Sequence, residues 1–211
     1  MNRPLVVRRG RPPAEQAGEV EERILQTAFD VFLARGYGHA TTDQIGRQAR
    51  VGNTTLYRRY PNKEALFDAV IHWSVVRAVD TVGFPVEAAT ASGRLRQMGI
   101  RMAEVALTPE VLGIMRMSAA EAVSSPAIAD LGYRIGFGAA VERAARAIAG
   151  TDDQDDIKGA RAAASIFVEL GLHPLELQGM FGISLDVLRP RIEEFVDGAI
   201  ATLLARQLLV D

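Results

Sequence analysis

The stretch of residues 41–66, TTDQIGRQARVGNTTLYRRYPNKEAL, constrains the fold of this chain most, because its helix-starting and helix-ending signals are closely spaced. Thr41 and Gln44, three residues apart, form a capping box, which predicts that a helix starts there. The break that follows at residues 50–52 has the length that a helix-turn-helix requires. These features predict two short helices at a sharp angle to each other.

The second short helix has signals at both of its ends. Either Gly52 or Asn53 caps its start. Pro61 ends it, because proline has no backbone N–H to donate within a helix. Asn62 is a good N-cap for a third helix, which is expected to continue to about Val82.

The side chains of this second helix suit a DNA groove, because they offer hydroxyls, an amide, a phenol and arginines but little apolar surface. Arginines and hydroxyls bind phosphates, while asparagine and arginine read base edges. The alternative is a solvated helical hairpin on the surface of some other kind of protein. Base contacts are expected from Asn53, Thr54 and Arg58, phosphate contacts from Tyr57, Arg59 and Lys63, and further contacts from Gln44, Arg47 and Thr55.

Residues 24–66 resemble the N-terminal domain of TetR-type transcriptional repressors. The matching segments, in order, are ILQTAFDVFLARGY, TTDQIGRQA and VGNTTLYRRYPNKEAL, and an ordered signature of this length is far more specific than an isolated helix-turn-helix pattern. The chain departs from the family in the turn, where Arg50 replaces the usual glycine and Gly52 replaces the usual serine. These departures leave open a one-residue shift in the start of the second helix.

The basic charge of the chain is concentrated near its N-terminus. Residues 1–63 carry 11 Lys+Arg against 6 Asp+Glu, a net of +5, and the remaining residues carry 13 against 20, a net of −7, which together give −2. This split suggests that only the front of the chain meets a polyanion. Residues 1–13 are expected to form a disordered basic arm, in which Arg8, Arg9 and Arg11 either enter a minor groove or only add solubility.

Every pattern beyond residue 85 is helical, so the predicted fold is all-α with about nine helices. A three-helix helix-turn-helix domain is expected at residues 14–62. An all-helical effector-binding and dimerisation domain is expected at residues 63–211, joined to the first through the helix that follows Asn62. The later helices are expected at about residues 88–107, from 109 onward, at 126–149, 152–172 (after a capping box of Thr151 and Gln154) and 186–208, with a looser link at 171–182.

The last two expected helices are the candidate dimer surface, because their small residues allow close approach and two such hairpins form a four-helix interface. The alternative is that both faces are buried within one subunit. The resemblance implies a homodimer through this region, whose two recognition helices would reach successive major grooves of a palindromic operator. The expected interface residues are Ala160, Ala163, Ala164, Phe167, Leu188, Ile192, Phe195, Ala199 and Leu203.

The second domain also contains apolar side chains with few polar anchors, a composition that suits a pocket for an apolar or amphipathic small molecule. The alternative is that these side chains are ordinary core. The resemblance implies that an inducer binds among the helices that follow the DNA-binding domain. The expected pocket residues are Trp73, Met98, Arg101, Met102, Met115, Arg116, Tyr133, Phe137 and Phe167.

Several kinds of chemistry find no support in the sequence. The chain has no cysteine, which excludes disulfides and thiolate metal sites, and we expect no cofactor. With no apolar run of about 18 residues and no signal sequence, we expect a cytoplasmic protein with no membrane partner, associated with the nucleoid when bound to DNA. His72 and His173 lack partners at catalytic or metal-binding spacing, so a small helical enzyme is a remote alternative to a ligand-responsive repressor. A ligand-unresponsive DNA-binding protein is the nearer alternative.

Overall fold

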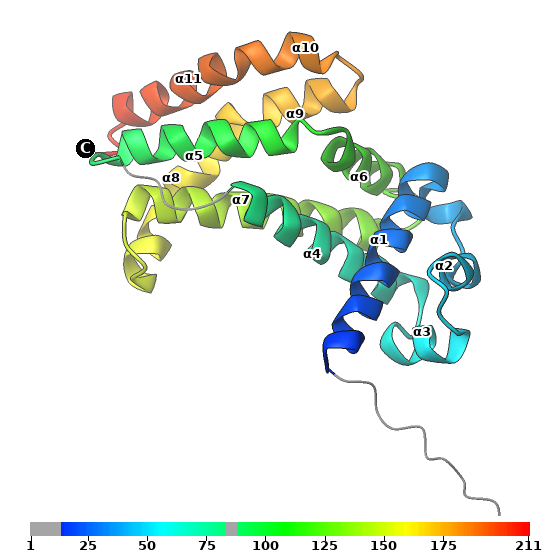
Figure 1. The fold of residues 1–211 in the computed structure, drawn as a ribbon. Helices are drawn as coiled ribbons and strands as arrows, with labels where there is room; N and C mark the ends of the chain where they lie inside the picture. The colour runs from blue at the N-terminus through cyan, green and yellow to red at the C-terminus, as the bar shows by residue number, and fades with distance from the viewer. Residues whose placement is uncertain (1–13, 83–87) are drawn as a thin grey trace, which may run out of the picture.

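The computed structural model describes residues 14–82 and 88–211 (Figure 1). The predicted basic arm, with Arg8, Arg9 and Arg11, lies outside the described residues. Within these two ranges every regular element is a helix, which confirms the all-α class. None of the helices in the described ranges is long and apolar enough to span a membrane.

The helices follow one another with short connections, and the predicted capping box is present in part, since the Thr41 hydroxyl accepts a hydrogen bond from the backbone N–H of Gln44 (3.2 Å). The N-terminal helices are α1 (Ala14–His39), α2 (Thr42–Gln48), α3 (Asn53–Arg59) and α4 (Lys63–Val82). The remaining elements are α5 (Ala91–Ala106), α6 (Pro109–Ala120), α7 (Pro126–Ala149), α8 (Gln154–Gly171), α9 (His173–Met180), α10 (Leu185–Leu188), the 3-10 helix η1 (Arg189–Arg191) and α11 (Ile192–Ala205).

The described residues contain more helices than expected, and the additions lie in the C-terminal part. The expected link at residues 171–182 contains α9, which has Pro174 in its first turn, where proline is well tolerated. The expected single helix at 186–208 is divided into α10, η1 and α11. Pro190 lies at this division, and proline interrupts a continuous helix because it lacks an N–H and its ring crowds the preceding turn.

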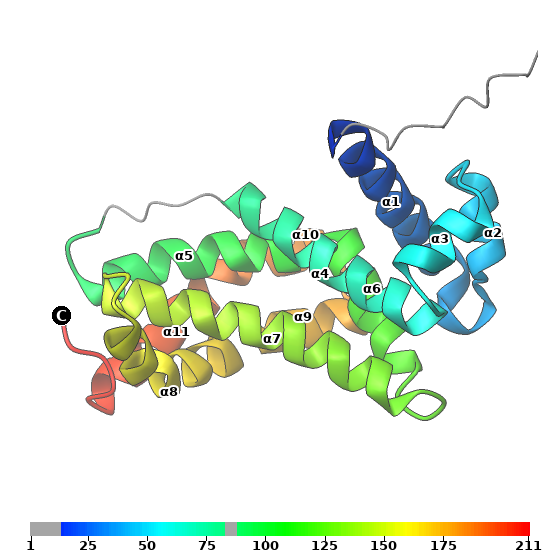
Figure 2. The same cartoon turned by 90° about the horizontal axis from the view of Figure 1, so that it is seen from below.

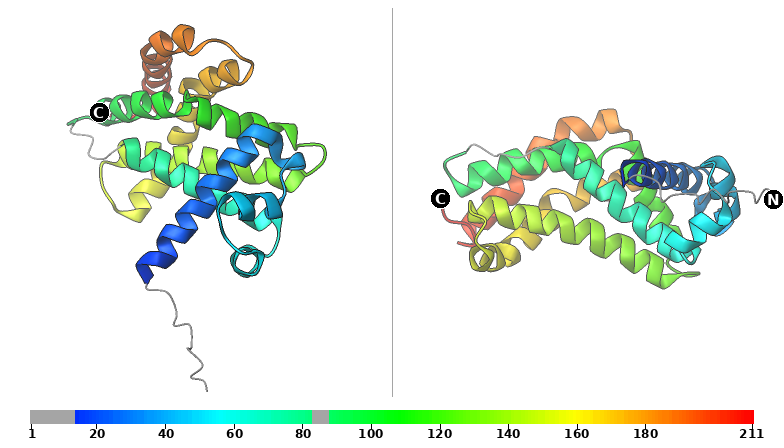
Figure 3. Two further views of the ribbon diagram at one scale, coloured as in Figure 1. Left: turned by 45° about the vertical axis from the view of Figure 1, so that its right-hand side comes forward. Right: turned by 60° about the horizontal axis from the view of Figure 1, so that its bottom comes forward.

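The first apolar core joins α1 and α4 to the facing ends of α6 and α7. Met117 of α6 and Ile128 of α7 are buried in the same cluster as the side chains of α1–α4. α1 and α6 lie close together at Gly113, where an added Cβ would lie only 2.8 Å from a methyl of Leu33. The helix-turn-helix of α2 and α3 lies beside α1 at one end of the molecule (Figure 3), so α6 and α7 connect it to the rest of the fold.

The second apolar core lies toward the other end of an elongated body, among α5, α7, α8, α9 and α11 (Figure 2). Two glycines allow its helices to approach closely. A Cβ added at Gly99 of α5 would lie 2.5 Å from the Phe167 ring, and one at Gly171 of α8 would lie 3.2 Å from Ala199 of α11. The core is therefore tightly packed around α8.

This packing corrects the predicted dimer residues. Because α8 lies between α7 and α11 of the same subunit, its small side chains serve contacts within the subunit, which was the alternative considered above. Ala160 and Phe195 are only partly buried. The predicted interface residues that are buried in this core are Ala163, Ala164, Phe167, Leu188, Ile192, Ala199 and Leu203.

Candidate nucleic-acid interface and ligand cavity

The turn between α2 and α3 fixes where the candidate recognition helix starts. Gly52 is the N-cap of α3 and Asn53 is its first residue. Of the two caps that the sequence offered, Gly52 is therefore the one observed. Arg50 adopts the left-handed conformation (φ 55°) that glycine would favour. Gly46 keeps the turn tight, because a Cβ there would lie 3.2 Å from Oδ1 of Asn53.

α3 is anchored by one side and presents the other to solvent. Leu56 is completely buried, whereas the Tyr57 side chain is 42% exposed. Asn53, Thr54 and Arg58 are also exposed, and Arg58 has no hydrogen-bond or ion-pair partner among the described residues. The predicted base-reading positions therefore share an accessible face. Among the secondary positions, Arg47 is exposed, while Gln44 and Thr55 are half-buried.

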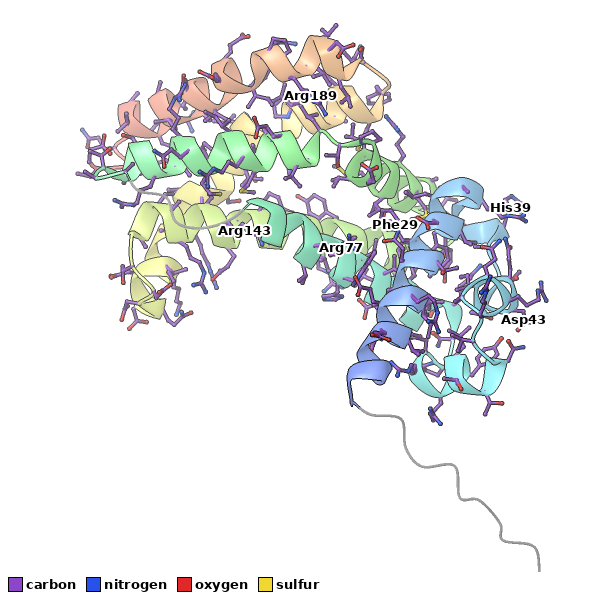
Figure 4. All side chains as sticks on the ribbon, in the orientation of Figure 1. Phe29, His39, Asp43, Arg77, Arg143 and Arg189 are labelled. Carbon is purple, nitrogen blue, oxygen red and sulfur yellow. The ribbon has the colours of Figure 1, made fainter. Side chains whose placement is uncertain are left out.

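Two of these exposed side chains are held by the first turn of α2. The amide Nδ2 of Asn53 donates to Oδ1 of Asp43 (3.0 Å). The hydroxyls of Tyr57 and Thr42 are hydrogen-bonded at 2.7 Å, and Tyr57 also donates to Asp43 at 3.4 Å. Sequence reasoning missed Thr42 and Asp43 because an acid in a first turn is explained equally well by the helix dipole. Figure 4 shows Asp43 on the outer side of the helix-turn-helix.

Arg59, predicted to contact phosphate, is bound to α1 in this structure. Its guanidinium donates to Oε2 of Glu21 on α1 (2.7 Å), and its side chain is only 22% exposed. Tyr60 donates to the other oxygen of Glu21 (3.1 Å). Burial, followed by Glu21, raises the pKa of Tyr60 to about 12, so its hydroxyl remains a donor. These contacts fasten the end of α3 to α1.

Lys63 also differs from the predicted phosphate ligand. Its ammonium donates to the backbone carbonyls of Tyr37 (2.8 Å), Ala40 (3.2 Å) and Gly38 (3.4 Å), at the end of α1. It also lies 4.3 Å from the centre of the Tyr37 ring. A cation suits this place because the last carbonyls of a helix have no partner within the helix. Lys63 therefore joins the start of α4 to the end of α1.

A cavity of about 330 Å³ lies between the two cores, lined by residues of α4, α5, α6, α7, α8 and α9. Four of the predicted pocket residues line it: Met102, Met115, Tyr133 and Phe137. Lining residues that the prediction did not include are Ile71, Ser74, Val105, Ala106, Val111, Ile114, Ser118, Ala119, Ala129, Gly132, Gly136, Ala139, Ala140, Arg143, Val168, Leu172, His173, Glu176 and Met180.

The other predicted pocket residues lie elsewhere, for identifiable reasons. Trp73 packs edge-on against Phe29 of α1, with ring centroids 5.9 Å apart. Arg116 donates to the carbonyls of Gly179 (2.6 Å) and Met180 (2.9 Å), at the end of α9. The remaining three are Met98 and Phe167, which are buried in the second core, and Arg101, which is exposed.

The cavity is mostly apolar but contains a small polar group of side chains. The Glu176 side chain is 14% exposed, and burial raises the pKa of its carboxyl to about 7. Nε2 of His173 lies 3.8 Å from Oε2 of Glu176, and burial lowers the pKa of this imidazole although Glu169 acts in the opposite direction. The hydroxyl of Ser118 is buried without a hydrogen-bond partner. Sequence reasoning missed Glu176 because α9 was expected to be a loose link.

An aromatic stack forms one side of this cavity. Tyr133 and Phe137, one turn apart on α7, have ring centroids 5.3 Å apart and an interplanar angle of 8°. The imidazole of His173 follows at 5.1 Å from Phe137. Flat side chains around an apolar space with a few polar groups are typical of small-molecule sites.

A helix-turn-helix with an exposed, polar second helix, carried by a helical body that contains a mostly apolar cavity, is the arrangement of a DNA-binding transcriptional regulator. Residues 24–70 match the family described as bacterial regulatory proteins, tetR family. Residues 93–206, more than half of the chain, match the C-terminal domain of the AefR-like transcriptional repressors. The chain therefore belongs to the TetR family, whose members are transcriptional regulators that bind DNA and act as dimers, and not enzymes.

Two curated relatives match the chain over less than a third of its length. The regulator SrpR of Pseudomonas putida is 38% identical over 61 residues, which are 29% of this chain and 29% of the relative. The uncharacterized regulator TtgW, also of P. putida, is likewise 38% identical over 61 residues, which are 29% of this chain and 46% of the relative. The match thus spans less than half of either relative.

Solved structures resemble nearly the whole chain, at low sequence identity. A Mesorhizobium loti protein assigned to the TetR family has 23% identity and a TM-score of 0.69, with 90% of this chain and 97% of that chain covered. The flavonoid-responsive regulator FrrA has 22% identity and a TM-score of 0.61, with 88% and 97% covered. These likenesses establish the fold.

Proposed function

We propose that this protein is a repressor that binds a palindromic operator as a homodimer and is released by a small apolar or amphipathic effector. Asn53, Thr54 and Arg58 would read base edges, while Tyr57 and Arg47 would contact phosphates. The exposure of these side chains on and beside α3 supports their roles. Arg50 is exposed in the turn and is a further phosphate ligand in this proposal.

The observation that carries the effector response is the position of the cavity. It is lined by α4 and α6, which also pack on the DNA-binding unit formed by α1, α2 and α3. At the C-terminal end of α6, Oε1 of Glu121 accepts a hydrogen bond from the backbone N–H of Gly38 (3.1 Å). At the start of α4, Lys63 binds the carbonyls of the same segment. A ligand that binds two arrangements of α4 and α6 unequally would therefore shift the DNA-binding unit.

The homodimer is supported by the family and by the outer faces of α8 and α11. Gly159, Ala162, Ile166 and Leu170 follow one face of α8 at helical spacing, and Leu170 is 42% exposed. Small exposed residues also follow one face of α11, at Gly198, Ala201 and Ala205. These outer faces, rather than the buried residues of the earlier prediction, are where a partner would pack.

The central test is footprinting of the protein on the DNA that flanks its own gene, repeated with metabolite pools. We expect two protected half-sites in successive major grooves, weaker protection as salt rises, and loss of protection with one pool. Binding that does not change with salt would contradict the proposed DNA contacts.

Two substitutions separate base reading from phosphate contact. Asn53→Ala should change the sequence preference, whereas Tyr57→Ala should weaken binding to cognate and unrelated DNA alike. Anisotropy titrations with an operator, a one-base variant and unrelated DNA measure both effects. Equal losses on all three DNAs from both variants would refute the assignment.

The alternative is a DNA-binding protein that responds to no ligand. Thermal-shift measurements with a broad library of apolar compounds distinguish the two, because a ligand that binds only the folded state raises the melting temperature. A library without a single stabilising compound would favour the alternative. A mostly apolar cavity of about 330 Å³ favours the responsive regulator.

A further inference from the structure

The carboxyl of Glu176 is the one acidic group among the described residues that line the cavity. Burial raises the pKa of this carboxyl to about 7, and its one ion-pair contact among the described residues is with the imidazole of His173. Its nearest charged neighbour is the imidazole of His173 at 3.8 Å, and burial keeps that ring mainly neutral near pH 7. A buried carboxylate without a cationic partner is unfavourable, so the site would gain from a cation that enters with a ligand.

Other charged groups around α9 do not fill this role. Arg116 of α6 binds the carbonyls of Gly179 and Met180. Arg143 of α7 also lines the cavity but is not among the groups that shift the pKa of Glu176. On α8, Glu169 affects the pKa of His173 and adds negative charge. The groups nearest to Glu176 thus leave its carboxylate available to a ligand.

The stacked rings beside this carboxyl favour the same kind of ligand. A flat ring system would extend the stack of Tyr133, Phe137 and His173 by offset or edge-on contact. Aromatic faces also attract cations, most strongly where water is excluded. The unpartnered hydroxyl of Ser118 offers a second polar contact to a ligand.

We propose that the effector is an aromatic or polycyclic molecule with a basic nitrogen, whose ammonium group pairs with Glu176 while its rings stack on Tyr133 and Phe137. This proposal rests on the effector response proposed above and specifies the class of effector. An aromatic carboxylate would instead place a second negative charge beside Glu176. A neutral aromatic molecule would stack equally well but leave the carboxylate unpaired.

Three probes with one ring system test this proposal: 2-(1-naphthyl)ethylamine, 2-(1-naphthyl)ethanol and 1-naphthaleneacetic acid. Isothermal titration of each into the full-length protein at about pH 8 should show the amine binding about tenfold more tightly than the alcohol, with the acid weakest. Because the amine stays protonated, its advantage should shrink toward about pH 6, where Glu176 takes up a proton. The alcohol should show little change with pH.

Glu176→Gln should remove the advantage of the amine over the alcohol and its dependence on pH. Glu104→Gln is the matched control, because Glu104 lies between the lining residues Met102 and Val105 of α5 but is exposed and lines no part of the cavity. It should keep wild-type preference. The pH series on the unchanged protein gives the same information without relying on the folding of a variant.

Equal affinity for amine and alcohol, preference for the acid, absence of binding by all three probes, or unchanged amine binding in Glu176→Gln would each overturn the proposal. DNA binding by the same preparations, followed by anisotropy, tests the proposed function separately. A protein that binds DNA and releases it with the neutral probe keeps that function and excludes the cationic effector. A protein that binds the amine but no DNA leads to the opposite conclusion.

Discussion

The DNA-facing unit, which consists of α2 and α3, differs from the cavity in whether its polar side chains find hydrogen-bond and ion-pair partners within the protein. In the DNA-facing unit, Asn53 and Tyr57 bind the first turn of α2, and Arg59 binds Glu21. In the cavity, burial raises the pKa of the Glu176 carboxyl, and the Ser118 hydroxyl has no hydrogen-bond partner among the described residues. The comparison teaches that the first surface is preorganised for a fixed target, whereas the second gains by binding a ligand that supplies missing interactions.

The largest expected effect tests the rigid side of this comparison. Leu56→Ala removes the buried anchor of α3 and should lower the free energy of unfolding by about 2–5 kcal/mol. Val76→Ala, at a position that is 56% exposed, is the control and should change it by less than about 0.5 kcal/mol. Denaturant unfolding measures both. Similar midpoints for the two variants would show that α3 is not held by this contact.

The next effect tests the unsatisfied side of the comparison. The pKa of Glu176 in the folded protein, about 7, exceeds its usual 4.5, so the folded state keeps a proton that the unfolded state releases. The stability that this proton provides is therefore lost as pH rises from 4.5 to about 7. Glu176→Gln should therefore be more stable than the wild type above pH 7, by up to about 3 kcal/mol. Below the usual pKa the difference should vanish. The prediction is wrong if the free energies of unfolding of the wild type and Glu176→Gln, measured from pH 4 to 8, differ by the same amount at every pH.

A paired substitution distinguishes internal cations from those that face DNA. Lys63→Met leaves three carbonyls at the end of α1 without their donor and should cost about 1–3 kcal/mol of stability. Arg47→Met, at an exposed position proposed to contact phosphate, should leave stability unchanged but reduce by about one the slope of log affinity against log salt. Thermal unfolding and anisotropy at several salt concentrations measure the pair. The reverse pattern would make Lys63 the phosphate ligand.

The smallest effect concerns the turn before α3. Arg50 has a positive φ, a conformation that costs a non-glycine residue about 1 kcal/mol. Arg50→Gly should therefore raise the free energy of unfolding by up to about 1 kcal/mol while weakening DNA binding, since it removes an exposed cation. If Arg50→Gly instead lowers the melting temperature, contacts of the Arg50 side chain must outweigh the cost of its positive φ.

Local signals in the sequence predicted the local parts of the fold. Thr41 and Asn62 were expected to cap helices, and each accepts a hydrogen bond from a backbone N–H of its first turn. The exposed face of α3 also follows from helical spacing around Leu56. These features depend on residues within a few positions of one another, which is why sequence alone was sufficient.

Contacts between distant segments were not predictable in the same way. The basic residues Arg59 and Lys63 looked available for phosphates, but the partner of Arg59 lies 38 residues away in the chain, and those of Lys63 lie 23 to 26 residues away. Phe167 looked suited to a pocket or a dimer, yet it fills the space above Gly99. Glu176 became recognisable as a cavity residue only once α9 was seen to be a helix packed beside α6 and α8.

The bond between Glu121 and Gly38 has a consequence for how the contact between α1 and α6 can diverge in related chains. Its donor is a backbone N–H, which every residue except proline provides, and a Cβ at position 38 would meet Glu121 at an ordinary 3.6 Å. Most substitutions at position 38 would therefore preserve the donor. The acceptor depends on one side chain, which Ser124 orients by donating to its other oxygen (2.7 Å). The connection between α1 and α6 at this point can thus be strengthened, weakened or lost by change at position 121 alone, without altering any residue that faces DNA.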